Sequence, residues 1–236
     1  MNHRGGFSSN LDRERKANKI RSILRETRKK DISHETILDI GTGNGAIASY
    51  FGDLSSFVTS VDIEDGRTVR GRFEFRLIQN ETLPFHDESF DIVISNHVIE
   101  HLSDQPRHIA EISRVLKPDG VAYLATPNRL WPWEFHYHIP LLHYLPLTIF
   151  TWLLKTFGKY KERVTLLSYF KLHGLLKSHF DCLLYSDRVI KQPSRYGMTC
   201  PVYLAKLLNI LPLSCYTTIA GLHPALIFVL RKKMGY

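Results

Sequence analysis

A run of closely spaced glycines constrains the fold of this chain more than any other feature of its sequence. The apolar stretch 37–40 stops at Gly41, Gly43 and Gly45, and Ala46 follows, so that the segment reads ILDIGTGNGA. Glycine adopts positive φ without strain and lets the main chain approach a ligand closely. The stretch therefore predicts a strand, a tight ligand-binding turn and a helix.

Strands and helices alternate on both sides of this turn. The expected strands are 36–40, 57–62, 73–78, 90–95, 121–126 and 181–190, and the expected helices are 10–30, 46–54, 105–117 and 166–179. Only a short basic link joins the second and third strands, so the helix usual there must be stunted. Such alternation predicts an α/β fold with a doubly wound parallel sheet, whose ligands bind at the carboxyl ends of strands.

We expect two unequal parts in the chain. Residues 1–30 form a basic N-terminal helical segment, and residues 31–236 form the main domain. Within that domain, residues 128–165 are aromatic, punctuated by proline and rich in histidine. This composition does not continue a sheet, so we expect an inserted cap. We expect it to lie over the site where the acceptor, the molecule on which the chain acts, would bind.

Charge and cysteine content limit which partners and which cellular compartment are expected for the protein. The net charge is +8 and the pI is near 9.4. A basic face could meet nucleic acid, anionic lipid or a phosphorylated substrate, or could simply be a solvated helix face. Three cysteines without metal-ligand spacing indicate reduced thiols, and no signal peptide is visible, so we expect a cytoplasmic protein.

An uncharged run near the C-terminus raises the question of a membrane span. Residues 207–230 contain no Asp, Glu, Lys or Arg, but Asn209, Pro212, Gly221 and Pro224 divide them. The last part, ALIFVL, is more typical of a buried strand. We expect no spanning helix, and peripheral membrane contact stays open.

Two cofactor classes use a glycine turn followed by an acidic residue after the second strand, and Asp62 fits that acidic position for both. The spacing G-x-G-x-x-A fits a nicotinamide or flavin dinucleotide, and D-x-G-x-G-x-G fits S-adenosylmethionine. Asp39 separates them, because a carboxylate repels a pyrophosphate but attracts a sulfonium and an ammonium. The turn therefore favours S-adenosylmethionine.

From about Thr36 to Asn128 the chain resembles the class I S-adenosylmethionine-dependent methyltransferases, the family that includes ubiquinone-pathway methylases. The matching pieces are ILDIGTGNG, VDIED, LPFHDESFDIVISNHVIEHLSD and ISRVLKPDGVAYLATPN, in the order and spacing of the family. Later pieces resemble the last helix and the closing strands. The resemblance implies a Rossmann-like, seven-stranded, mostly parallel sheet with an antiparallel closing strand.

The resemblance also implies which residues hold the cofactor. The three glycines would wrap its methionine part, with Asp39 near the ammonium, and Asp62 would accept from the ribose hydroxyls. Gln79 stands where many members have an acidic residue that contacts the adenine, and its carboxamide oxygen can still accept. The expected cofactor-binding residues are Asp39, Gly41, Gly43, Gly45, Asp62, Ile63, Gln79, Asn80 and Asn96.

Methyl transfer to oxygen or carbon needs a general base in addition to alignment. The candidates are His97 after the fourth strand and His136 and His138 in the cap. His97, Glu100 and His101 share one face if their segment is helical, but we expect no metal there and a structural role for His101. Each imidazole could also merely satisfy a local hydrogen bond.

The acceptor is not identified by the sequence. Aromatic residues of the cap suit an apolar or ring-shaped molecule. We expect a methyltransferase acting on a small-molecule, lipid or glycan-intermediate acceptor. The alternatives are an RNA methyltransferase, an NAD(P)-binding oxidoreductase and a catalytically silent S-adenosylmethionine-binding protein.

Overall fold

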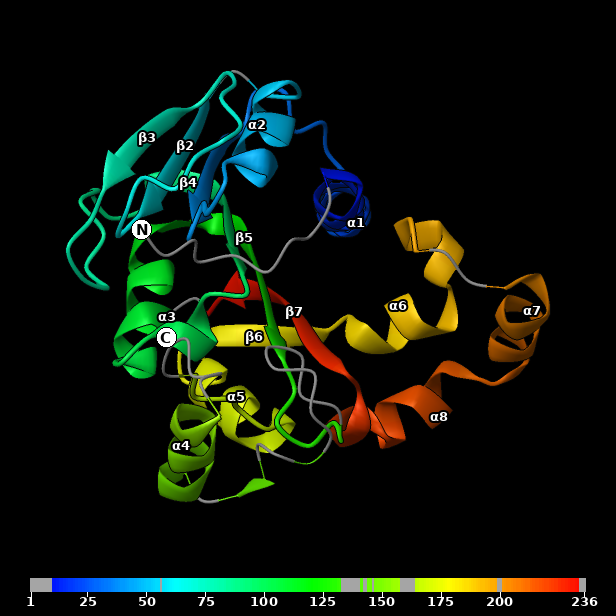
Figure 1. Ribbon diagram of the computed structural model, residues 1–236. Helices are drawn as coiled ribbons and strands as arrows, with labels where there is room; N and C mark the ends of the chain where they lie inside the picture. The colour runs from blue at the N-terminus through cyan, green and yellow to red at the C-terminus, as the bar shows by residue number, and fades with distance from the viewer. Residues whose placement is uncertain are drawn as a thin grey trace.

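The computed structural model describes residues 10–55, 57–132, 141, 144–145, 147–157, 164–198 and 201–233. A seven-stranded sheet in the order β3-β2-β1-β4-β5-β7-β6 forms its centre (Figure 1). The strands are β1 Thr36–Ile40, β2 Phe57–Asp62, β3 Glu74–Leu77, β4 Phe90–Asn96, β5 Leu116–Pro127, β6 Phe180–Leu184 and β7 Ala225–Lys232. The first five strands pair in parallel, whereas β7 runs antiparallel to both β5 and β6. The predicted fold class is confirmed.

Helices cover both faces of the sheet, and a hydrophobic core lies between the sheet and the helices on each face. One face is covered by α1 Asn10–Arg28, α2 Ala46–Gly52 and α6 Ser186–Lys191, and the other by α3 Gln105–Val115 and α5 Tyr169–Leu176 (Figure 1). The short η3 Pro193–Tyr196 adds to the α1 side. The apolar stripe of α1 is fully buried, as its helical spacing predicts, through Ala17, Ile20, Ile23 and Leu24.

Two segments differ from the sequence expectation. Leu116 pairs with Phe90 and Val121 pairs with Ile92, so residues 117–120 bulge opposite Asp91 inside one long strand. The turn-forming sequence Lys-Pro-Asp-Gly is thus absorbed as a bulge rather than a separate connection. The expected strand 181–190 stops at Leu184, because the chain turns there into the helix α6.

The uncharged C-terminal run is divided as its sequence indicates. It contributes to α7 Val202–Ile210, then to α8 Leu213–Thr218 and η4 Ala220–Leu222, before β7 enters the sheet. Residues 226–230 are buried between β5 and β6, so ALIFVL is an interior strand. In the described parts of the chain, no helix combines the length and apolarity needed to cross a bilayer.

The segment expected to form a cap is described only in part. It includes α4 Leu147–Thr156, whose Phe150 and Leu154 are buried. His136 and His138 lie outside the described residues. The start of the segment is fixed by Asn128, whose buried amide donates to the carbonyl oxygens of Gly221 and His223, both at 2.8 Å.

Candidate functional site

The candidate site lies where the strand order reverses. β1 leads outward to β2 and β3, whereas its other neighbour β4 leads to β5, so the loops after β1 and β4 part at this point. Doubly wound sheets bind ligands in the crevice that such a reversal opens at the carboxyl ends. The two loops also touch, because a Cβ on Gly41 would lie 2.4 Å from a methyl carbon of Val98.

The turn after β1 needs glycine at its three predicted positions. Gly41, Gly43 and Gly45 have φ values of +72°, +55° and +87°, a region that other L-residues rarely adopt. A Cβ on Gly45 would lie 2.3 Å from the carbonyl oxygen of Val69, whereas a Cβ on Gly43 would meet nothing within 4 Å. Gly43 therefore borders open space, which is the cradle a ligand could fill.

The link between β2 and β3 lies against this turn. Residues 63–73 contain no helix, and the amides of Thr68 and Val69 donate to the carbonyl oxygen of Asn44 at 3.1 and 2.9 Å. The helix expected to be stunted is thus replaced by an irregular segment. Its backbone holds the glycine turn from the side of Gly45.

Asp62 ends β2 and is fixed by two backbone amides. Its Oδ2 accepts from the amide of Gly43 at 2.8 Å and its Oδ1 accepts from the amide of Ile63 at 2.7 Å. Each carboxylate oxygen has a second lone pair for a further donor. The arrangement suits a pair of neighbouring hydroxyl groups beside the glycine turn.

Asp39 is buried beneath the turn. The hydroxyl of Thr42 donates to its Oδ2 at 2.9 Å, and only 2% of the residue is exposed. Burial raises the pKa of Asp39 to about 7, with Thr42 opposing the shift and the charge of Asp62 adding to it. A carboxyl group held in this way gains free energy when a cation reaches it.

These features together fit S-adenosylmethionine. The open space at Gly43 accommodates a ligand against the main chain, and Asp62 presents a fixed acceptor for ribose hydroxyls. Asp39 adds a carboxyl that favours an ammonium or a sulfonium and would repel a pyrophosphate. The donor set thus fits the cationic cofactor better than a dinucleotide.

The other expected cofactor residues lie at the same edge of the sheet. Ile63 is an exposed apolar side chain directly after Asp62. Gln79 and Asn80 are exposed after β3, where the amide of Ile78 donates to the carbonyl oxygen of Asp62 at 2.9 Å. Asn96 is the last residue of β4 and is half-buried.

His97 follows β4 with an unusual backbone. Its φ is +60°, and its amide donates to the carbonyl oxygen of Ala125 at 2.8 Å. Its Nδ1 lies 3.3 Å from Oε1 of Glu100, whose other oxygen accepts from the hydroxyl of Thr126 at 2.9 Å. The Nε2 of His101 is farther from the same Oε1, at 4.0 Å. A positive φ in a residue other than glycine is a strain that often accompanies function.

Glu100 carries a buried negative charge beside these imidazoles. Burial alone would raise the pKa of Glu100, but the hydrogen bond from His97 and the charges of both histidines outweigh it and hold the pKa below its usual range. A carboxylate facing Nδ1 favours the tautomer with a proton on Nδ1 and a free lone pair on Nε2.

The structure adds a second imidazole to the site, His108, which is not among the residues predicted from the sequence. His108 of α3 is fully buried, and its Nε2 lies 2.9 Å from the hydroxyl oxygen of Ser95 in β4. Burial lowers the pKa of His108 to about 4, so the ring is neutral. It ties α3 to the carboxyl end of β4. The available signal was a histidine in register with Ile112 and Val115 on the apolar face of the expected helix.

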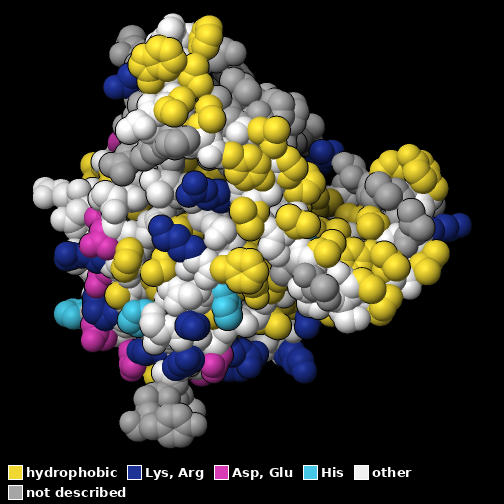
Figure 2. Space-filling view, turned by 90° about the horizontal axis from the view of Figure 1, so that it is seen from below, with side chains coloured by type: hydrophobic (Ala, Val, Ile, Leu, Met, Phe, Trp, Pro, Cys, Tyr) yellow, Lys and Arg dark blue, Asp and Glu magenta, His cyan; other side chains and the backbone are white. Residues whose placement is uncertain are grey.

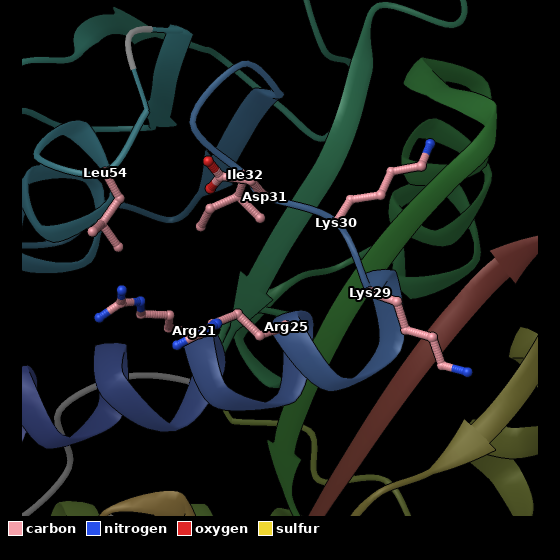
Figure 3. A pocket seen from close by; sticks show the side chains of 7 residues that line it. All are labelled: Arg21, Arg25, Lys29, Lys30, Asp31, Ile32 and Leu54. Carbon is pink, nitrogen blue, oxygen red and sulfur yellow. The ribbon is translucent and has the colours of Figure 1, made fainter.

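A hollow of about 400 Å³ lies elsewhere, between α1 and the end of α2. It is lined by Arg21, Arg25, Lys29, Lys30, Asp31, Ile32 and Leu54. Ile32 precedes β1, so the hollow lies toward the amino end of that strand and away from the glycine turn. Lys29 and Lys30 point away from Arg21 rather than toward a shared centre (Figure 3).

The segment around this site matches known proteins. Residues 38–124 match the family described as a methyltransferase domain. A probable S-adenosylmethionine-dependent methyltransferase of Mycolicibacterium smegmatis is 36% identical over 99 residues, which cover 40% of this chain and 38% of that protein. The ubiquinone biosynthesis O-methyltransferase of Bartonella tribocorum is 31% identical over 109 residues, covering 42% and 44%.

The fold match extends further than the sequence match. A crystal structure of an S-adenosylmethionine-dependent methyltransferase from Mesorhizobium loti superposes with a TM-score of 0.58 at 13% identity, covering 89% of this chain and 96% of that one. In sequence, the chain spans less than half the length of the two curated relatives, 38% and 44%. The likeness is therefore strongest in the cofactor half.

Proposed function

We propose that this chain, which belongs to the class I S-adenosylmethionine-dependent methyltransferase family, transfers a methyl group to oxygen or carbon of a small-molecule, lipid or glycan-intermediate acceptor. The observation that carries the proposal is Asp39 buried under a turn of three positive-φ glycines, with its pKa raised to about 7. That arrangement fits a cationic cofactor at the strand reversal. Similarity to the ubiquinone biosynthesis O-methyltransferase of Bartonella tribocorum supports transfer to oxygen.

Bound S-adenosylmethionine would supply a methyl group on a positively charged sulfur; in-line attack of a nucleophile on that methyl group would break its bond to sulfur and release the neutral thioether. Asp39 would hold the ammonium group, and Asp62 would accept from the ribose hydroxyls. The glycine turn brings its backbone against the methionine part. Ile63, Gln79, Asn80 and Asn96 complete the cradle at the ends of β2, β3 and β4.

In this mechanism His97 takes the proton from the acceptor. Glu100 faces Nδ1 of His97 at 3.3 Å and keeps a proton there, so Nε2 has the lone pair that removes a hydroxyl proton. As methyl transfer proceeds, the imidazole becomes positively charged, and the negative charge of Glu100 stabilises that state. Thr126 holds the second oxygen of Glu100 and fixes its orientation.

Residues 128–165 form a cap over the acceptor in this proposal. The support is the anchoring of Asn128 after β5, at the same sheet edge as the cofactor residues, and the aromatic content of the segment. His136 and His138 stay as alternative bases from the cap. The RNA alternative draws its support from the basic charge of the chain.

The direct test is methyl transfer from labelled S-adenosylmethionine. The full chain is incubated with the labelled cofactor and separate lipid, glycan and metabolite extracts, and labelled products are separated by chromatography. We expect label in one organic fraction, lost on His97→Asn. Label in RNA alone would overturn the acceptor class, and cofactor binding without transfer to any fraction would favour the catalytically silent alternative.

A further inference from the structure

The charge of the chain is unevenly distributed. Residues 133–236 contain 13 Lys or Arg against four Asp or Glu, whereas residues 1–132 contain 18 against 19. After Asp187 the sequence has no acidic residue, although seven Lys or Arg follow. Arg188, Arg195 and Lys232 pair with Glu26 or Glu88 of the first part, at 3.4, 3.3 and 2.9 Å. The C-terminal part still carries an excess of positive charge.

The same part of the chain exposes large hydrophobic side chains. Tyr203 and Ile210 of α7 are 77% and 76% exposed, and Phe170 of α5 is 72% exposed. We call the apolar face the set Phe170, Tyr203, Ile210, Leu211, Ile219 and Leu222. Exposed apolar side chains that gather in this way mark an interaction surface.

The members of the apolar face come from neighbouring elements. Tyr203, Lys206 and Ile210 are three and four residues apart on α7, so they share one side of that helix. A Cβ on Gly221 in η4 would lie 3.7 Å from the ring of Phe170 in α5. In Figure 2 hydrophobic side chains gather over the lobe at the right, where Figure 1 places α7 and α8, and the visible acidic side chains lie away from it.

Lysines lie within and beside this face. Lys206 is exposed between Tyr203 and Ile210, and Lys171 is exposed next to Phe170. Lys191 donates to the carbonyl oxygen of Leu211 at 2.6 Å, which places its charge at the end of α7. Aromatic and aliphatic side chains among lysines are the composition of segments that lie in the interface of an anionic bilayer.

The apolar face also lies near the edge of the sheet that carries the site. Ala225, which starts β7 directly after η4, pairs with Pro127 at the carboxyl end of β5. The amide of Asn128 donates to the carbonyl oxygen of Pro224 at 3.1 Å. The part of the apolar face at η4 is therefore close to the end of β5, where the acceptor would enter.

We propose that the apolar face with its lysines binds the surface of a membrane that contains anionic phospholipid. The apolar side chains enter the interfacial region, and Lys171, Lys191 and Lys206 lie at the level of the headgroups. Neither contribution alone holds a protein firmly, and two together do. The charge of this region favours lipid over a second copy of the chain, because two such cationic faces would repel each other.

The test is sedimentation of the full chain with vesicles of phosphatidylcholine alone and with about 30 mol% phosphatidylglycerol. We expect the partition coefficient to be at least about tenfold higher on the anionic vesicles and to fall when salt is raised from about 50 to about 300 mM. Equal binding to both vesicles, or none to either, would overturn the proposal.

Matched variants separate this face from other exposed groups. Tyr203→Ser with Ile210→Ser should lower the partition coefficient about tenfold or more, since two apolar side chains no longer enter the interface. Lys206→Glu should lower it about fivefold or more. The controls are Phe57→Ser, an exposed aromatic change on β2, and Lys30→Glu, the same charge change on the N-terminal segment, each expected within about twofold of wild type.

Two further measurements control for misfolding of the variants and for self-association. Circular dichroism and cofactor binding report whether each variant is folded, and variants that lose either are replaced by Leu222→Ser, which changes one exposed side chain after the helices. Light scattering reports the oligomeric state. A dimer broken by Tyr203→Ser with Ile210→Ser, in a protein that ignores vesicles, would assign the face to a second copy and overturn the proposal.

Discussion

The two halves of the described chain differ in the chemical character of their surfaces. In residues 10–132, three large hydrophobic side chains are exposed, against fourteen in the described residues from 141 to 233. The first half holds Asp39 and Asp62 at its glycine turn and includes the segment that matches the methyltransferase domain. The second half is cationic and apolar outside. The residues that we propose for cofactor recognition therefore differ in character from the surface of the second half.

This contrast indicates which half of the chain we expect to bind the cofactor and which half to distinguish the chain from other proteins with the same cofactor. In our proposal a cofactor shared by many enzymes is held by backbone geometry and two carboxylates, which sequence comparison detects easily. The apolar face and the segment 128–165 lie outside the matched residues 38–124. We therefore expect changes at the glycine turn and at His97 to act on cofactor binding and turnover, and changes in the apolar face to leave both nearly unchanged.

The largest expected effect is on turnover, at His97. His97→Asn should lower kcat by about 100-fold or more, because general-base catalysis commonly contributes that much, and leave the cofactor Kd within about twofold. Glu100→Gln should lower kcat by a smaller factor and shift the pH profile, since a neutral amide no longer favours the tautomer with the proton on Nδ1. Kinetics across pH 6 to 9 and calorimetry check both. Near-wild-type turnover in both variants would assign the base to another residue.

The second effect compares a glycine from each half. Gly45→Ala places a Cβ 2.3 Å from the carbonyl oxygen of Val69 at a φ of +87°, so it should destabilise the fold by about 2–3 kcal/mol and abolish measurable cofactor binding. Gly174→Ala, in the middle of α5 with nothing within 4 Å of the new Cβ, should stabilise by about 0.5–1 kcal/mol without changing binding. Urea unfolding and cofactor titration measure both. Equal effects of the two changes would erase the contrast between the halves.

The third effect concerns ribose recognition. Asp62→Ala removes the acceptor that the amides of Gly43 and Ile63 hold in place, so the cofactor Kd should rise about tenfold or more, since hydrogen bonds to charged groups are worth roughly 1.5–3 kcal/mol. Asp181→Ala, an exposed carboxylate on β6, is the matched control and should change nothing. An unchanged Kd in folded Asp62→Ala would remove Asp62 from the site.

Much of this architecture is predictable from short-range patterns. The bounds of β1 and β2 agree with the apolar runs at Thr36 and Phe57, because glycine or polar residues end each run. The contact between His108 and Ser95 could not be predicted, since it joins side chains from two elements whose packing only the fold defines. The positive φ of His97 and the bulge at residues 117–120 depend likewise on neighbouring strands.

The measurement that tests the central claim most directly is the pH dependence of cofactor binding. Burial raises the pKa of Asp39 from 3.8 to about 7 in the folded protein. The cofactor-free protein therefore loses stability as the pH rises from about 3.8 toward 7, because the buried carboxylate then ionises without a cation beside it. A bound ammonium favours the ionised form, so binding releases a proton below pH 7.

Calorimetric titration with S-adenosylmethionine and with its demethylated product at pH 6 and pH 8 reads this linkage. We predict that the affinity rises about tenfold between the two pH values, with proton release at pH 6. In Asp39→Asn the affinity should be lower and nearly independent of pH. No heat with either ligand, together with clear binding of NAD, would contradict the account.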